Sequence, residues 1–296
     1  MHRRSSGTVR PRRLIVNADD FGISETVNEA VIRAFVEGAL TSCSLMVTGE
    51  AFEHAVRLAH AHPGLAVGIH LVTVMGRAVL PPAEIPTLVD AAGHFASNPT
   101  LAGLKYYFSP QARRELRREL SAQFETFAAT GLRLSHIDGH LHMHVHPVVF
   151  QIALELGQRY GVRCMRVPQE EYRLAIHFDR QHAGTKALYT WLFRRLARRM
   201  QRQLRASGFV YAERVYGNLH SGQMDEHYFL YMLDHLCAAT NEIYFHPAVY
   251  PVERVHNAAE QQGMREFAAL TSPAVRRRVH ERGIALMNYV DLEEST

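Results

Sequence analysis

The chain has 296 residues, 47% of them hydrophobic, which is enough to bury one large core. Its net charge of +4 is a mild excess, and the sequence has no zinc finger, RNA-binding aromatic motif or phosphate-binding glycine loop, so we expect no nucleic-acid partner. Three widely separated cysteines give no disulfide or zinc framework. No apolar stretch approaches the roughly 18 residues of a membrane span, and no secretory signal is recognisable. These properties predict a cytoplasmic protein.

Strand-like and helix-like segments alternate along the chain, which is typical of a parallel sheet covered by helices. Up to residue 71, the pattern predicts strands at 14–17, 42–47 and 66–71 and helices at 24–38 and 51–62. Residues 74–110 are rich in Pro and Gly and are predicted to form a long excursion, of the kind that often acts as a lid or binding loop.

The same alternation continues after the excursion. It predicts helices at 111–130, 147–160, 186–205, 225–236 and 271–283 and strands at 134–138, 162–167, 242–245 and 284–288. About seven strand–helix units of this kind predict one α/β domain over residues 13–296, a distorted (β/α) barrel, preceded by a flexible basic tail at 1–12.

The first predicted strand is followed by two adjacent carboxylates, Asp19 and Asp20. In α/β folds, catalytic groups lie at the carboxyl ends of parallel strands. Because neighbouring residues at a strand end point in different directions, one carboxylate can bind a cation while the other stays free as a base. The alternative, that both only cap the following helix, is weakened because Ser24 and its neighbours already offer capping groups.

The run from Ser135 to Pro147 places ligand-type side chains at alternate positions. They are His136, Asp138, His140, His142, His144 and His146. An extended backbone would direct them to one face, and neutral imidazole is the commonest metal ligand. A solvated His-rich loop or a chance tract is the alternative, but the intervening apolar residues and the closing proline argue against both. The pattern predicts a metal-dependent active site.

A third strand end supplies His70, which follows Gly68 and Ile69. A single histidine at such a position is more often a satisfied polar residue. Together with Asp20 and His140, however, it completes an Asp-His-His set from three strand ends, and three protein ligands with room for water are typical of a catalytic metal site. Such a set suits zinc, cobalt or nickel, and magnesium where water completes the shell.

Five motifs, spread from the first strand to residue 248, resemble those of a known family. They are Asn17-Ala18-Asp19-Asp20-Phe21-Gly22, Thr41-Ser42 with Leu45-Met46-Val47, Gly68-Ile69-His70-Leu71, His136-Ile137-Asp138-Gly139-His140 and His246-Pro247-Ala248. The chain resembles the YdjC-like (ChbG-type) carbohydrate deacetylases over nearly its whole length. The resemblance implies a metal-dependent amidohydrolase on a barrel related to the polysaccharide deacetylases.

Two stretches within the predicted excursion, 76–86 and 106–110, resemble the hopanoid-biosynthesis-associated HpnK branch of this family. This resemblance implies removal of the acetyl group from N-acetylglucosaminyl bacteriohopanetetrol, which leaves a free amine on a lipid-borne sugar. A soluble N-acetylated sugar, such as a chitooligosaccharide, is the alternative substrate. A metal-dependent phosphoesterase and a non-catalytic metal- or lipid-binding protein are alternatives from other functional classes.

We expect a division of roles among the candidate residues. Asp20, His70 and His140 would hold one divalent metal ion. Asp19 would take the proton of the attacking water, and His246 would protonate the departing amine.

The other candidates would support the site or contact the substrate. Arg166 would either fix Asp19 through a bidentate ion pair or serve the structure alone. Asp138 would orient an imidazole ring, and Asn17 would hydrogen-bond at the strand end. His136 is either an alternative ligand or part of the barrel lining. The candidate sugar contacts are His142, His144 and His146.

The segment 186–205 combines an apolar stripe with six arginines. A basic amphipathic helix is typical of a membrane-surface element, but an ordinary helix that packs on the barrel and exposes its arginines fits the same pattern. A lipid-borne substrate would favour membrane contact. The sequence leaves the oligomeric state open.

Overall fold

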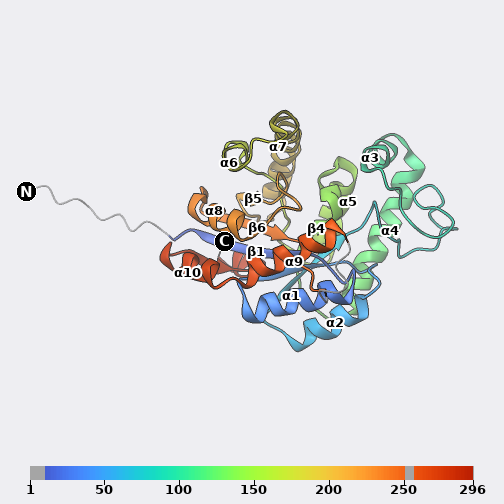
Figure 1. Cartoon of the computed structure of the whole chain (residues 1–296). Helices are drawn as coiled ribbons and strands as arrows, with labels where there is room; N and C mark the ends of the chain where they lie inside the picture. Colours follow the sequence, from blue (N-terminus) through green and yellow to red (C-terminus); the bar gives the residue numbers. More distant parts are fainter. Residues whose placement is uncertain (1–10, 251–256, 296) are drawn as a thin grey trace, which may run out of the picture.

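The computed structural model describes residues 11–250 and 257–295, which form an α/β fold with helices around a parallel sheet (Figure 1). Residues 1–10 of the predicted basic tail lie outside the described residues. The strands are β1 (Arg13–Phe21), β2 (Ser42–Leu45), β3 (Ala66–Leu71), β4 (Leu134–Gly139), β5 (Arg214–Tyr216), β6 (Thr240–Phe245) and β7 (Ala285–Met287). The helices are α1 (Glu25–Glu37), α2 (Phe52–Ala61), α3 (Pro99–Phe108), α4 (Pro110–Ala129), α5 (Pro147–Arg159), α6 (Tyr172–Phe178), α7 (Ala183–Ala206), α8 (Glu226–His235), α9 (Ala258–Thr271), α10 (Pro273–Glu281) and α11 (Tyr289–Glu294).

The strands pair in the order β4-β3-β2-β1-β6-β5, all parallel, and β7 pairs with the first half of β1. These regular strands form a half-barrel, and an irregular segment joins its two edges. Ile137 of β4 bonds through its backbone to Cys164 and Arg166 (3.0 and 2.9 Å), while the Gln169 carbonyl accepts from the Val215 amide of β5 (3.2 Å). The predicted α/β barrel-type fold is thus confirmed, although the strand predicted at 162–167 is present only as isolated bridges.

Complete burial explains why the central strands read as continuous apolar runs. A parallel sheet covered on both faces needs apolar side chains on both sides of each strand, and β3 is buried at every position. Its Gly68 is required by close packing, because a Cβ atom there would lie 2.3 Å from the ring of His136. Strands β2, β3 and β6 therefore appear close to their predicted positions and deliver their last residues to one edge.

The histidine run departs from its predicted extended conformation. β4 ends at Gly139, and residues His140–Val145 form a 3₁₀ helix, with Leu141 and His142 in the left-handed region (φ +50° and +54°). The predicted alternation of side chains on one face is therefore wrong beyond Gly139. His146 serves instead as the N-cap of α5, where its Nδ1 accepts from the Val148 amide at 3.3 Å.

Several helices escaped prediction because local capping signals were missed. The excursion contains α3, which begins with the N-cap Asn98 and a proline in its first turn. The helix predicted at 271–283 corresponds to α10, which begins at Pro273 after the N-cap Ser272, whereas α9, which begins at a capping box of Asn257 and Glu260, was not predicted. α6 and β5 were also not predicted. Within the described part of the chain, no helix is both long and apolar enough to cross a membrane.

Candidate active site

The structure brings together the three predicted metal ligands. Asp20 comes from β1, His70 from β3, and His140 from the turn directly after β4. The Asp20 Oδ1 atom lies 3.2 Å from His70 Nε2 and 3.0 Å from His140 Nδ1. One ligand atom from each residue lies within 4.8 Å of the other two. Three strand ends therefore supply one carboxylate and two imidazoles at a single point.

The backbone separates the two adjacent carboxylates. Asp20 has φ +62°, a conformation that costs roughly 1–3 kcal/mol for a non-glycine residue and tends to occur at functional sites. The register between β1 and β2 shifts at the same place, between Ala18 and Phe21. Asp20 faces the two histidines, whereas Asp19 is buried against Arg166, as expected for neighbours that point in different directions.

His70 is held from behind by Asp138. The His70 Nδ1 and Asp138 Oδ1 atoms lie 2.8 Å apart, and Ser44 donates to the other Asp138 oxygen at 2.7 Å. Burial alone would lower the pKa of His70, but Asp138 and Asp20 raise it to about 10. Asp138 thus fixes the ring of His70, and the surrounding carboxylates favour a positive charge at this point.

Arg166 is fully buried and binds three carboxylates. Its guanidinium donates to both oxygens of Asp19 (2.7 and 2.8 Å) and to Glu242 (2.8 Å), and it forms an ion pair with Asp138 (2.8 Å). The bidentate pair with Asp19, expected from the sequence, is therefore present, and it fixes the carboxylate plane. Burial would raise the pKa of Asp138, but Arg166 and His70 hold it well below its usual range.

The donor chemistry at Asp20, His70 and His140 fits a divalent cation. One carboxylate and two imidazoles form a typical three-ligand set that leaves room for water. A second group, Asp19, His70 and Asp138, also has its ligand atoms within reach of one another. Both of its carboxylates are already paired with the Arg166 guanidinium, so a cation there would lie beside a fixed positive charge. The first group is therefore the better candidate.

Two of the candidate ligands, His70 and His140, line a cavity of about 330 Å³. The cavity extends from the carboxyl edge of the sheet to the first turn of α3 and the N-terminal half of α7, and it combines catalytic-type side chains with apolar ones. It is lined by Asp19, His70, Pro99, His140, Leu141, His142, Tyr189, Phe193, Asn218, Ser221, Tyr244 and His246.

His246 and His142 lie in this cavity, together with a tyrosine that the sequence did not single out. His246 follows β6, and its ring packs edge-on against Tyr244 at 5.7 Å between centroids. The Tyr244 hydroxyl lies 3.0 Å from His142 Nε2, while His142 Nδ1 is buried with no hydrogen-bond partner among the described residues.

The remaining candidates lie outside the cavity lining. Asn17 is buried and donates to Asp19 (2.9 Å). His136 stacks on Tyr289 at 3.9 Å, and burial lowers its pKa to about 3, so it is a neutral part of the barrel lining. It belongs to neither ligand group found in the described residues. His144 is buried, with Nε2 3.1 Å from the carbonyl of Arg166, and the half-buried His146 caps α5.

Glu242 and Tyr244 of β6, which bind Arg166 and line the cavity respectively, were not predicted from the sequence, although a signal was available. Glu242, Tyr244 and His246 alternate toward the end of a buried strand, which places them on one face. The same reasoning that selected the histidine run would have selected this set. Asn218 and Ser221 lie in a loop without such a period, so nothing in the sequence indicated them.

Comparisons with known proteins show which family the chain belongs to. Residues 13–281 match the family described as YdjC-like protein. The chain is 36% identical to a carbohydrate deacetylase of Brevibacillus brevis, over 95% of this chain and 99% of the relative. It is 32% identical to a chitooligosaccharide deacetylase of an Enterobacter species, over 94% and 98% of the two chains. A solved structure from Enterococcus faecalis, assigned to cellobiose-phosphate cleavage, is 26% identical with a TM-score of 0.70, over 95% and 99%. The chain belongs to the YdjC-like protein family.

Proposed function

We propose that this protein is a metal-dependent N-deacetylase that hydrolyses the acetamide of an N-acetylglucosamine group. The observation that carries the proposal is the Asp20–His70–His140 set, whose two histidines line the same cavity as a separate carboxylate, Asp19. A protein that only binds a metal has no need of this second carboxylate. The names of the carbohydrate deacetylase relatives support the same reaction class.

Asp19 is the proposed general base. A divalent cation (zinc, magnesium, cobalt or nickel) held by Asp20, His70 and His140 would polarise the acetamide carbonyl and make a water molecule more acidic. Asp19 Oδ1 accepts from Arg166 and Asn17, but Oδ2 accepts only from Arg166 among the described residues. A carboxylate oxygen can accept about two hydrogen bonds. Oδ2 therefore keeps one position for the proton of the attacking water.

His246 is the proposed general acid. It lines the same cavity as Asp19, and its proton would pass to the nitrogen as the carbon–nitrogen bond breaks. The products are acetate and a free amine. Tyr244 and His142 line the same cavity, and we assign them contacts with the sugar hydroxyls. Arg166, Asn17 and Asp138 act through Asp19 and His70 as positioning residues.

For the substrate, we propose a lipid-borne sugar of the N-acetylglucosaminyl bacteriohopanetetrol type. One HpnK-like stretch, 106–110, covers the end of α3, and α3 contributes Pro99 to the cavity wall, whereas the other stretch, 76–86, lies in the loop before this helix. Leu141, Tyr189 and Phe193 add an apolar section to the same wall, which suits the apolar part of a lipid. The segment 186–205 would then lie at a membrane surface. A soluble chitooligosaccharide is the alternative, in line with the name of one relative.

Acetate release from two substrates tests this proposal. The metal-loaded protein is given N-acetylglucosaminyl bacteriohopanetetrol in one assay and diacetylchitobiose in another. We expect selective release from the lipid-borne sugar. Release from diacetylchitobiose alone would retain the chemistry and discard the lipid substrate. Release from neither would contradict the deacetylase proposal itself.

A further inference from the structure

The two halves of α7 have different surroundings. In the C-terminal half, Met200 and Leu204 are buried against the body of the protein. In the N-terminal half, Leu188 and Trp191 are 64% and 54% exposed, and Leu192 is also exposed. The apolar stripe therefore packs as an ordinary core face for half its length and is uncovered for the other half, so the packing of the helix does not account for the exposed residues.

α3 exposes a similar apolar face on the other side of the cavity mouth. Leu101, Leu104 and Phe108 follow a helical spacing and are all exposed, with Phe108 at 71%. Figure 1 shows α3 and α7 rising on the same side of the sheet, with α5 between them. Pro99 of α3 and Tyr189 of α7 both line the catalytic cavity. The two apolar faces therefore flank its mouth.

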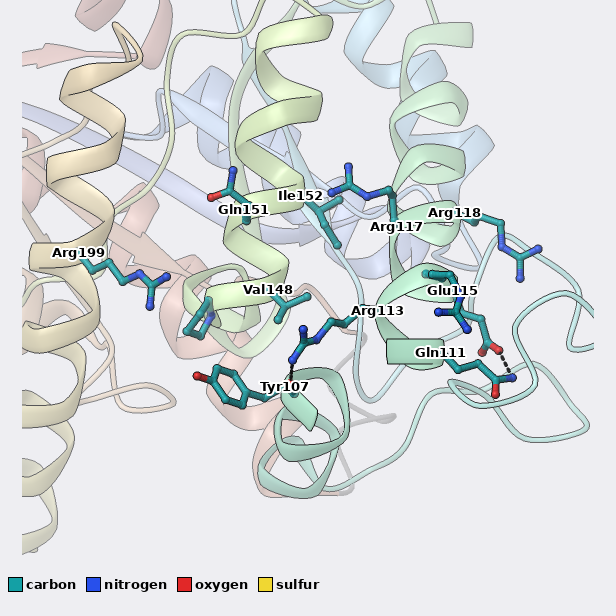
Figure 2. A pocket seen from close by; sticks show the side chains of 12 residues that line it. Tyr107, Gln111, Arg113, Glu115, Arg117, Arg118, Val148, Gln151, Ile152 and Arg199 are labelled. Atoms are coloured by element: carbon teal, nitrogen blue, oxygen red, sulfur yellow. Dashed lines mark hydrogen bonds between the residues drawn. The ribbon is translucent and has the colours of Figure 1, made fainter. Parts of the chain in front are cut away.

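A cleft of about 930 Å³ lies between α4, α5 and α7, and it is strongly basic. In Figure 2, Arg199 of α7 points across the cleft toward Arg113 and Arg117 of α4, over a floor formed by Val148 and other residues of α5. α7 carries six arginines and one lysine and no acidic residue. Arg113 and Arg117 bind protein oxygens, whereas no protein hydrogen bond or ion pair of Arg199 is found among the described residues.

We propose that α3, the N-terminal half of α7 and the basic cleft form a docking surface for an anionic lipid membrane. The exposed apolar side chains of α3 and α7 enter the bilayer interface, and the cleft arginines bind lipid phosphate groups. Apolar residues flanked by arginines are the composition that binds such interfaces. The proposed membrane binding does not depend on the proposed function. Only its purpose, to bring a lipid-borne substrate to the cavity mouth, rests on that function.

The charge pattern favours a membrane over a second copy of the chain. A symmetric dimer places the same patch on both sides of its interface, so the arginines of one α7 would face those of the other without acidic partners. A small soluble anion could occupy the cleft, but it would leave the apolar faces of α3 and α7 uncovered. An anionic bilayer satisfies both features at once.

The single tryptophan of the chain provides a direct test, because Trp191 lies in the proposed surface. Its emission is measured while the full-length protein is titrated with phosphatidylcholine vesicles, with or without phosphatidylglycerol. We expect a blue shift and quenching by brominated acyl chains with the anionic vesicles only, both reversed by high salt. The proposal would be overturned if the Trp191 emission did not change with vesicles or changed equally with neutral ones. It would also be overturned if the emission shifted without vesicles because the protein associates with itself. Saturable binding of inorganic phosphate without any vesicle binding would overturn it as well. This readout needs no turnover, so its failure is distinct from a failure of acetate release.

Matched variants locate the surface. Leu188→Ser in α7 and Phe108→Ser in α3 should each weaken vesicle binding, whereas Val36→Ser, an exposed position on α1 across the sheet (Figure 1), should not. Arg198→Gln with Arg199→Gln should lower the partition coefficient about fivefold per arginine, and the exposed Arg277→Gln should leave it unchanged. If Val36→Ser in α1 and Arg277→Gln in α10 weakened vesicle binding as much as the variants in α3 and α7, binding would not be confined to the proposed surface.

Discussion

Replacement of Asp19 by asparagine is expected to lower kcat by about 10²- to 10⁴-fold, the usual contribution of a general base. The variant keeps the shape of the side chain and an oxygen for Arg166, so the fold is expected to persist. Because the metal would be held by Asp20, His70 and His140, metal content should remain at the wild-type level. Steady-state acetate release and metal analysis of the same sample measure both quantities.

Asp20→Asn is the matched variant for this experiment, since it also replaces one carboxylate oxygen by an amide nitrogen, at the neighbouring residue. It should lose metal affinity and activity together. A fully active Asp19→Asn enzyme would remove Asp19 as the base. Loss of metal in Asp19→Asn but not in Asp20→Asn would reverse the roles that we assign to the two carboxylates.

Replacement of Arg166 by methionine should destabilise the metal-free protein by roughly 3–5 kcal/mol, the cost of removing one partner from a buried ionic network. Asp19, Asp138 and Glu242 would remain buried without the guanidinium that they share. Urea unfolding followed by circular dichroism gives the free energy of unfolding. If Arg166→Met is too unstable to purify, this outcome agrees with the predicted loss of stability. The double variant Arg166→Met with Glu242→Gln should then be more stable than Arg166→Met alone.

Arg278→Met provides the control for this prediction. Arg278 also pairs with carboxylates, Asp234 and Glu281, but its side chain is about one-third exposed, so solvent replaces the lost partner. Its loss of stability should be far smaller than that of Arg166→Met. Equal losses for the two variants would show that the buried position of Arg166 carries no special weight.

The ends of the strands were predictable, and with them the centre of the site. Asp20 and His70 follow short apolar runs, His140 follows the predicted strand at 134–138, and the parallel topology places the ends of such strands at one edge. The sequence did not indicate where β4 stops, because alternation alone cannot distinguish an extended chain from the left-handed turn at Leu141 and His142. Beyond Gly139, the predicted wall of histidines therefore divides into two cavity residues, His140 and His142, the buried His144 and the helix cap His146.

Long-range partners were predictable only where chemistry restricted the choice. A bidentate pair between Arg166 and Asp19 was expected as one of two alternatives. The ion pair of Arg166 with Glu242 was not expected, because nothing in the sequence links these two residues, which are 76 positions apart. Likewise, the stripe on α7 reads as one continuous face in the sequence. Only packing shows that half of it is covered and half is exposed.

The central claim is that a metal held by Asp20, His70 and His140 supports N-deacetylation, and its most direct test is acetate release before and after metal removal. The protein is treated with a chelator, freed of it, assayed, and assayed again after addition of zinc, cobalt, nickel or magnesium. We predict that activity is lost on chelation and restored by at least one of these ions. Full activity in protein shown to be free of metal would contradict the claim.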